Sequence, residues 1–150
     1  MQNLGVNYNY ILETSLIDLR QKSKVWLSEV ELRLIELAFF RKMLRLNKER
    51  LIEGNTSIEN ELDHYRELID YYEVRLLRDL KKRLKKHEGK LVKLMDGHPV
   101  QDEESFRENH KNIGQVVHAF GNEFRNLKKE FLTFIEPQKN NRYVSHINTD

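Results

Sequence analysis

The sequence predicts an all-α protein, an elongated antiparallel three-helix bundle with coiled-coil-like packing and helices over about 15–53, 57–96 and 102–136. Two observations predict this fold. Turn residues separate three long stretches at two places, and short connections between long helices favour an up-down-up arrangement. Within each stretch, apolar residues recur every three or four positions, as on one face of a supercoiled helix. The clearest run alternates steps of four and three residues: Phe106, His110, Ile113, Val117, Phe120, Phe124, Leu127, Phe131 and Phe134.

The first helix is expected to begin at Ser15, because Ser15 and Asp18 have the spacing of a capping box. Its periodicity continues to Glu53, where a glycine and an asparagine supply a stop signal. Residues 1–14 are then expected to form a separate N-terminal segment that packs on the bundle.

The second helix is expected to open at a capping box formed by Thr56 and Glu59 and to run to about Asp96, where Gly-His-Pro breaks it. Asp102 opens the third helix, and the proline at position 137 ends it. The polar residues 137–150 are expected to form a flexible tail.

The register of the helices is also predicted. Antiparallel neighbours joined by a tight turn should pair at a constant sum of residue numbers, and the apolar strips satisfy this along their full length; Tyr65, for example, is expected beside Phe131. The basic end of the first helix would lie beside the acidic start of the second. Leu76, Leu80 and Leu84 form a stutter of two four-residue steps in the core strip, which should locally relax the supercoil.

Composition limits the functional classes. The chain has 150 residues, of which 33% are charged, and a net charge of +2, which is too small to indicate a polyanion partner. It has no cysteine, which excludes disulfides and a thiolate zinc site. No stretch approaches about 18 consecutive apolar residues, so no membrane span is predicted. The first 12 residues lack the pattern of a secretory signal, and we expect a cytoplasmic protein.

A polar layer is predicted inside the apolar core, where Ser23, His87 and His110 fall at the same level. Two imidazoles could bind a transition metal or sense pH. We favour a buried hydrogen-bonded layer that sets the register, as polar core positions do in coiled coils, because two histidines with no core carboxylate nearby are too few for a tight metal site. No metal and no other cofactor is therefore predicted.

One Glu-x-x-His pair, Glu61 and His64, has the spacing used by di-iron bundles. Such sites need two of these pairs and two further carboxylates that face the core. This single pair flanks the core residues Leu62 and Tyr65 instead of replacing them, so we expect a solvated helix face.

A basic ridge is predicted on the second helix, where nine Lys or Arg residues between positions 75 and 93 oppose two acidic ones. Such a ridge could follow nucleic-acid phosphates or anionic lipid headgroups. No aromatic residue is interleaved for base stacking, and the acidic start of the third helix should lie alongside, so an internally compensated, solvated face is favoured. The ridge consists of Arg75, Arg78, Lys82, Lys85, Lys86 and Lys93.

The first helix gives the strongest indication of function, because it carries a second apolar row roughly opposite its core strip. A helix that is apolar on two faces must be covered on both. The cover could be residues 4–12 or another chain, and we favour a homodimer or a helical partner protein. The second row consists of Leu32, Ile35, Phe39, Met43 and Leu46.

No glycine-rich phosphate loop, nucleophile elbow or zinc-protease motif occurs in the sequence. We therefore expect a non-catalytic interaction or structural module that self-associates or docks a partner helix through the second row. A nucleic-acid-binding protein that uses the basic ridge is the alternative, and a helical-bundle metalloprotein is the third possibility. The plan resembles many three-helix modules, spectrin repeats among them, without a motif specific to one family.

Overall fold

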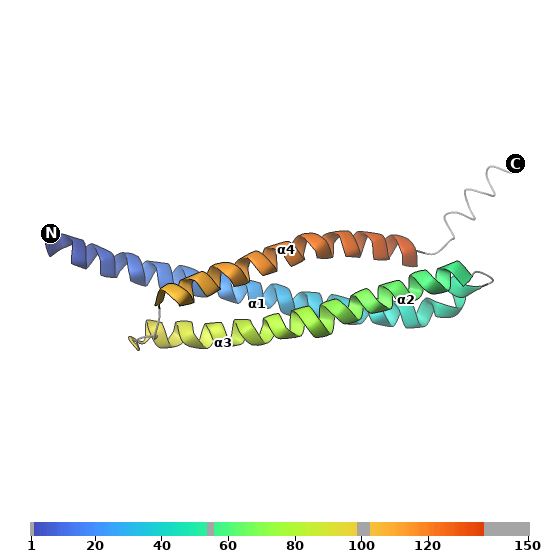
Figure 1. The fold of residues 1–150 in the computed structure, drawn as a ribbon, viewed down its shortest axis with the longest axis horizontal. Coiled ribbons are helices and arrows are strands. Elements are labelled where there is room, and N and C mark those ends of the chain that lie inside the picture. The colour runs from blue at the N-terminus through green and yellow to red at the C-terminus, as the bar shows by residue number, and fades with distance from the viewer. Residues whose placement is uncertain (1, 54–55, 99–102, 137–150) are drawn as a thin grey trace, which may run out of the picture.

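A computed structural model describes residues 2–53, 56–98 and 103–136, and these residues are almost entirely helical. The prediction of an all-α protein is confirmed for this part of the chain, which contains no strand. Three segments, α2, η1 and α3, follow one another without a break and form a single rod (Figure 1). The elements are α1 (Gln2–Ile52), α2 (Thr56–Asp70), the π-helical segment η1 (Tyr71–Leu77), α3 (Arg78–Met95) and α4 (Glu103–Ile135).

Ion pairs show how α1 lies against the rod of α2, η1 and α3. Arg41 of α1 pairs with both Asp70 and Glu73, whereas Glu31, ten residues earlier, lies 3.7 Å from the Nζ atom of Lys81. Residue numbers therefore rise along the rod as they fall along α1. The pairs of Arg41 are the charge pairing expected between the end of the first helix and the start of the second.

The contacts of α4 show in which direction it runs relative to α1 and relative to the rod. Residue numbers rise in the same direction along α1 and α4. Trp26 lies against His110, with ring centroids 4.6 Å apart, and further along both helices Arg50 donates a hydrogen bond to the carbonyl oxygen of Ile135 at 2.8 Å. Along the rod the order is reversed, because Tyr65 contacts Phe131 near the end of α4, at a centroid distance of 5.6 Å. The predicted contact between Tyr65 and Phe131 is therefore present.

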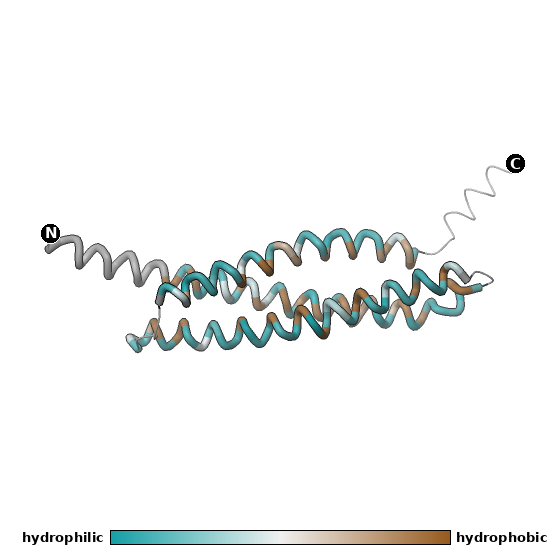
Figure 2. The backbone as a smooth tube through the Cα atoms, viewed as in Figure 1, coloured by the Kyte–Doolittle hydropathy of each residue, from teal (hydrophilic) through white to brown (hydrophobic). Residues whose placement is uncertain are grey.

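The core consists of apolar side chains contributed by every helix. Figure 2 shows how hydrophobic residues recur among hydrophilic ones along the described helices. In α1 Phe40 is buried beside five residues that have an exact spacing of seven: Ser23, Val30, Leu37, Leu44 and Leu51. In α4 every predicted core position from Phe106 to Phe131 is buried, but the last one differs. Ile135 is buried in place of Phe134, which stacks at the edge of the core on Tyr65, with ring centroids 4.8 Å apart.

The π-helical segment η1 corrects the phase of the core strip in the rod. In the rod, one buried series has steps of seven residues except for a step of eight, from Ile69 to Leu77. The series consists of Leu62, Ile69, Leu77, Leu84 and Leu91, and Leu80 and His87 are buried between its later members. A π turn contains one residue more than an α turn, and the backbone N–H of Arg78 bonds to the carbonyl oxygen of Glu73, five residues earlier. The extra residue returns Leu77 to the core face, where it is fully buried. The prediction of Leu76 as the core residue is wrong, since Leu76 lies at the edge of the core.

The helix ends agree with the prediction except at the start of α1. At the end of α3, Gly97 has φ 87°, and the N–H of His98 bonds to the carbonyl oxygen of Lys93 at 2.9 Å, which completes a Schellman motif. The first helix begins at Gln2 and not at Ser15. A capping box needs a non-helical residue at the N-cap, and the backbone at Ser15 is helical.

The two expected terminal segments have different outcomes. Residues 2–14 continue α1 instead of forming a separate segment. The expected packing of their side chains on the other helices lies outside the described residues. The expected flexible tail, residues 137–150, also lies outside them.

Gly114 of α4 makes room for an aromatic ring. A Cβ atom at Gly114 would lie 2.8 Å from Cζ2 of Trp26, too close for a normal contact. At Gly121, one heptad further along the same helix, a Cβ atom would meet nothing within 4 Å. Only the first of these two glycines is therefore required by the packing.

We predict opposite effects for alanine at these two positions. Gly121→Ala should raise the free energy of unfolding by up to about 1 kcal/mol, the usual gain of alanine over glycine within a helix. Gly114→Ala should lower it, because overpacking against Trp26 costs about 1–3 kcal/mol and exceeds that gain. Urea denaturation followed by circular dichroism measures both; equal stabilisation by the two substitutions would contradict the assigned role of Gly114.

Candidate functional site

The second apolar row of α1 is largely exposed to solvent. The exposed fractions are 50% for Leu32, 67% for Ile35, 52% for Phe39 and 65% for Leu46. Met43 differs from the other four, because it is partly buried and packs against the core. Four of the five predicted interface residues therefore share one solvent-exposed face.

The row extends further towards the N-terminus than the predicted interface residues. Val25 is 60% exposed and precedes Leu32 by seven residues, so Val25, Leu32, Phe39 and Leu46 form an exact heptad series, with Ile35 between its members. We call these five residues the exposed row. It spans about 32 Å at a rise of 1.5 Å per residue. The seven-residue spacing back from Leu32 was the signal that could have identified Val25.

The exposed row points away from the other helices. Phe39 follows the fully buried Leu37 by two residues, which is about 200° around an α-helix. Residues 4–12 cannot cover the row within the same chain, because they lie at least about 20 Å further along the axis of the same helix. The heptad spacing is the pattern by which one helix packs on another.

The predicted polar layer contains a direct contact between two histidines. Nε2 of His87 lies 2.7 Å from Nδ1 of His110, and the exposed fractions of the two residues are 1% and 6%. The ring of His87 stacks on Phe106 at a centroid distance of 4.5 Å, and His110 lies against Trp26. Ser23 is also buried, and within the described structure its hydroxyl has no hydrogen-bond partner.

Both histidines are held in the neutral form. Burial, together with the nearby charges of His110 and Lys90, lowers the pKa of His87 to about 4. Burial also lowers the pKa of His110, assisted by Lys22. A neutral imidazole has one N–H and one acceptor nitrogen, so one ring donates and the other accepts. The outer nitrogens, Nδ1 of His87 and Nε2 of His110, have no partner among the described residues.

This arrangement provides little for a metal ion. The two nitrogens that face each other are joined by a hydrogen bond, so they cannot both serve as ligands of one ion. In the part of the chain that the structure covers, no three His, Cys, Asp or Glu side chains are grouped closely enough to hold a metal. The chemistry available to the pair is the uptake of a proton.

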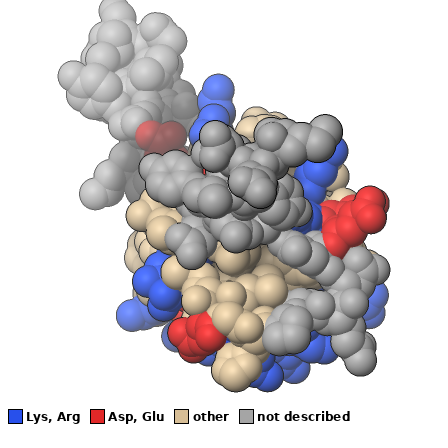
Figure 3. Space-filling view, turned by 90° about the vertical axis from the view of Figure 1, so that its left-hand side faces the viewer, with Lys and Arg blue, Asp and Glu red and all other residues tan. Residues whose placement is uncertain are grey.

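The basic ridge is exposed over its whole length. All six of its residues are solvent-exposed, and only Arg78 forms an ion pair with a described residue, Glu73, at 3.3 Å. The expected compensation by the start of the third helix is not seen at Glu104 or Glu108, neither of which pairs with the ridge in the described structure. Figure 3, an end-on view, shows Lys and Arg side chains along the lower edge, the side on which α3 lies in Figure 1.

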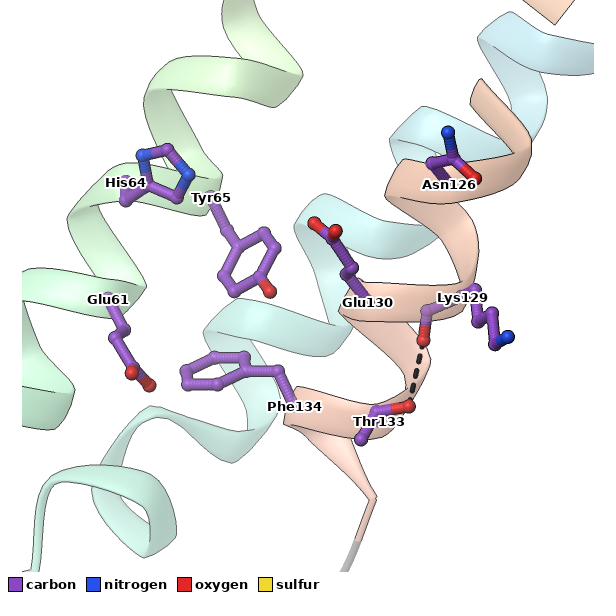
Figure 4. A pocket seen from close by; sticks show the side chains of 8 residues that line it. All are labelled: Glu61, His64, Tyr65, Asn126, Lys129, Glu130, Thr133 and Phe134. Carbon is purple, nitrogen blue, oxygen red and sulfur yellow. Dashed lines mark hydrogen bonds between the residues drawn. The ribbon is translucent and has the colours of Figure 1, made fainter. Parts of the chain in front are cut away.

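A groove of about 680 Å³ lies between α2 and α4 (Figure 4). The exposed Glu61 and His64 belong to one wall and Glu130 to the other, with the rings of Tyr65 and Phe134 between them. Burial raises the pKa of Tyr65, and the carboxylates of Glu130 and Glu61 raise it further. The groove therefore has an aromatic floor and charged walls, and the spacing of Glu61 and His64 in the sequence indicates only its α2 side.

We predict that the histidine pair makes the fold sensitive to acid. The folded pKa of His87 is about 4, below the ordinary value of about 6.5, so between these values the unfolded chain binds protons that the folded chain does not. Stability should be insensitive to this group above about pH 6.5 and should fall as the pH is lowered towards 4, by about 2 kcal/mol at pH 5. Urea denaturation at pH 7 and pH 5 measures this change.

The control for this experiment is His87→Leu combined with His110→Leu. This double variant should remain folded, be at least as stable as the wild type at pH 7, and lose most of the difference between pH 7 and pH 5, because two polar groups that are costly to bury have been removed. An unchanged pH dependence in the double variant would show that other groups cause it. Stoichiometric zinc or iron in the purified wild type, lost in the double variant, would instead establish a metal site.

No family model matches the chain, and no curated protein and no solved structure matches it. Among the helices of the described ranges, none is long and apolar enough to cross a membrane. The evidence for function therefore comes from the surfaces themselves: the exposed row, the basic ridge and the groove.

Proposed function

We propose that the protein is an antiparallel three-helix bundle that acts as a non-catalytic interaction module in the cytoplasm, and that its exposed row binds a second copy of the chain. The observation that carries the proposal is the row itself: five apolar side chains in heptad spacing, each at least half exposed, on the face of α1 opposite the core. The opposite residue order of α1 and the rod, together with the shared order of α1 and α4, supports the bundle.

The energy available from the exposed row is sufficient for association. Full burial of a Val, Leu, Ile or Phe side chain contributes about 1.5–3 kcal/mol. Because each member of the row is already partly covered, roughly half of that remains for each of the five, which amounts to several kcal/mol per chain. This gain must exceed the loss of rotational and translational freedom on association, so we expect a dimer of moderate affinity.

The spacing of the row favours a helical partner over a flat surface. Side chains seven residues apart stay on one line of a supercoiled helix and fit between four side chains of a facing helix. A second copy offers such a facing helix, α1 itself, with the same row. The resulting dimer would join two three-helix units about a two-fold axis, in which the same patch of each chain faces the other.

We predict that Ile35→Glu combined with Phe39→Glu gives a folded, helical monomer, because the charges would have to be buried on association while both positions are exposed in the single chain. Light scattering across a dilution series measures the mass, and circular dichroism measures the helicity.

The matched control replaces two exposed apolar residues outside the row, Val92→Glu and Leu132→Glu. This control variant should retain the mass of the wild type. A wild type that is monomeric at about 100 μM, which corresponds to an association weaker than about −5.5 kcal/mol, would refute self-association. Unfolding of the Ile35 and Phe39 variant would place the row in the intramolecular core.

Nucleic-acid binding through the basic ridge is the second candidate, and one observation favours it. Five of the six ridge residues are exposed cations without an ion pair in the described structure. Such cations are free to replace the counterions of a phosphate backbone.

If the ridge binds phosphates, duplex DNA or RNA should bind with an affinity that falls steeply with salt, because counterion release scales with the number of phosphates contacted. Reversal of Arg78, Lys82 and Lys85 to Glu should then abolish binding measured by fluorescence anisotropy. The control, reversal of the exposed Lys111 and Lys129 of α4, should have a much smaller effect. Absence of binding at low ionic strength would show that the ridge is only a solvated face.

A further inference from the structure

The charged residues beside the exposed row indicate how two copies would pair. One edge consists of the residues immediately before the four heptad members of the row, Val25, Leu32, Phe39 and Leu46. These residues are all exposed: Lys24, Glu31, Ala38 and Arg45. The other edge consists of the residues four positions after the same heptad members: Glu29, Glu36, Met43 and Arg50. In paired helices the residues at these two edges decide partner choice and orientation through their charges.

A parallel dimer of α1 would bring like charges together. In that arrangement each residue of the first edge faces the residue five positions later on the second edge of the partner. Glu31 would then face Glu36, and Arg45 would face Arg50. Only Lys24 and Glu29 would form an attractive pair, so the parallel orientation is disfavoured.

An antiparallel dimer brings equivalent edges together, and one register makes the first edge complementary. When the two helices cross with the two-fold axis near Leu37, Glu31 of each copy faces Arg45 of the other, and the two small Ala38 side chains meet beside the axis. In the same register Phe39 of each copy packs against Ile35 of the other. The full row, including Val25, stays opposite α1 of the partner.

The second edge opposes this register only in part. Arg50 of each copy faces Lys22 of the other, but Arg50 donates hydrogen bonds to Asn47 and to the carbonyl oxygen of Ile135, and Lys22 pairs with Asp18. Glu36 lies nearest to its own copy across the axis, but its carboxylate already accepts hydrogen bonds from Arg33 at 2.5 Å and from Lys128 of α4 at 2.7 Å. Its side chain is 18% exposed, so it is compensated within its own chain. Arg45, in contrast, has no ion pair with any described residue and is available to a partner.

Registers one heptad away are less favourable. Moving the axis towards the N-terminus places Lys24 opposite Arg45, which is a repulsion on each side of the axis. Moving it towards the C-terminus places Glu29 opposite Arg50 but leaves Glu31 and Arg45 without charged partners. It also moves Val25 beyond Ile52, where α1 ends, so the row is no longer fully covered. The register centred near Leu37 alone combines an attractive first edge with a fully covered row.

From these relations we infer that the exposed row is a two-fold, antiparallel self-association surface, with Glu31 of each copy paired to Arg45 of the other and Phe39 packed on Ile35. This inference rests on the proposed function and adds the orientation and the register. The ligand of the row is thus a second copy of this chain, selected by its charge order.

Charge reversal gives a test in which the sign of the effect identifies the orientation. Glu31→Arg and Arg45→Glu should each weaken the dimer about tenfold, because each replaces two attractive pairs by two repulsions. The two single variants mixed in equal amounts should form a heterodimer of about wild-type affinity, since every facing pair is again opposite in charge. Analytical ultracentrifugation at low and high salt measures these affinities, and the differences should shrink at high salt.

Two further measurements keep this test specific. Glu31 also lies near Lys81 in its own chain, so Lys81→Ala is the control and should leave the dimer unchanged. Because the chain has no cysteine, a single cysteine at position 24 or 38 carries the only spin label. Between copies, labels at position 38 should be close, and labels at position 24 should be about 40 Å apart along the axis.

The outcomes separate this inference from the proposed function. A dimer that is tightened by Glu31→Arg, with short distances from both labels, is parallel and overturns the inference while the exposed row remains an interface. A dimer indifferent to both reversals, with labels at position 24 about 50 Å apart, has the neighbouring register and also overturns it. A monomeric wild type refutes the proposed function itself.

Discussion

The arrangement of the helices depends on the burial of one strip of α1. Five of the six buried residues among the described side chains of α1, from Ser23 to Leu51, are exactly seven apart, and Phe40 is the sixth. The strip therefore stays on one line for most of the helix and can be covered by the rod on one side and α4 on the other. The covering helices must keep the same period. In the rod, a step of eight residues would turn the strip out of the core, and the π-helical segment absorbs the extra residue. The irregular segment η1 thus keeps the buried residues of both α2 and α3 in contact with the core.

The burial of this strip also determines where Gly114 and the two buried histidines lie. Close approach of α1 and α4 near their first shared contacts requires glycine at position 114, because the ring of Trp26 occupies the space of a side chain there. That ring also covers His110, while Phe106 covers His87. The histidines meet inside an aromatic enclosure that excludes water. Their neutrality therefore follows mainly from burial, with a smaller contribution from neighbouring positive charges.

Much of this structure could be predicted from the sequence, because heptad periodicity specifies both the helices and their buried faces. The core positions of α4 from Phe106 to Phe131 and the contact of Tyr65 with Phe131 followed from the pattern alone. Leu77 could not be recognised, since a π turn is stabilised by packing on both of its flanks and has no local signal. The start at Gln2 was missed because the capping-box spacing at Ser15 is a local pattern that a continuing helix overrides. In the candidate site, Val25 was missed because Ser28, at the row position between Val25 and Leu32, is polar. The lack of pairing along the basic ridge depends on side-chain directions that spacing does not reveal.

The order of the helices along the chain has a consequence for folding. The ion pairs of Arg41 close loops of 29 and 32 residues, and the histidine pair closes a loop of 23, whereas the contact of Glu36 with Lys128 closes a loop of 92. Loop closure costs more entropy as the loop lengthens, so we expect two hairpins, one around each turn, to form before α1 meets α4. The rod of α2, η1 and α3 belongs to both hairpins. Once both have formed, α1 and α4 are already held side by side, and the long-range contacts require little further loss of chain entropy.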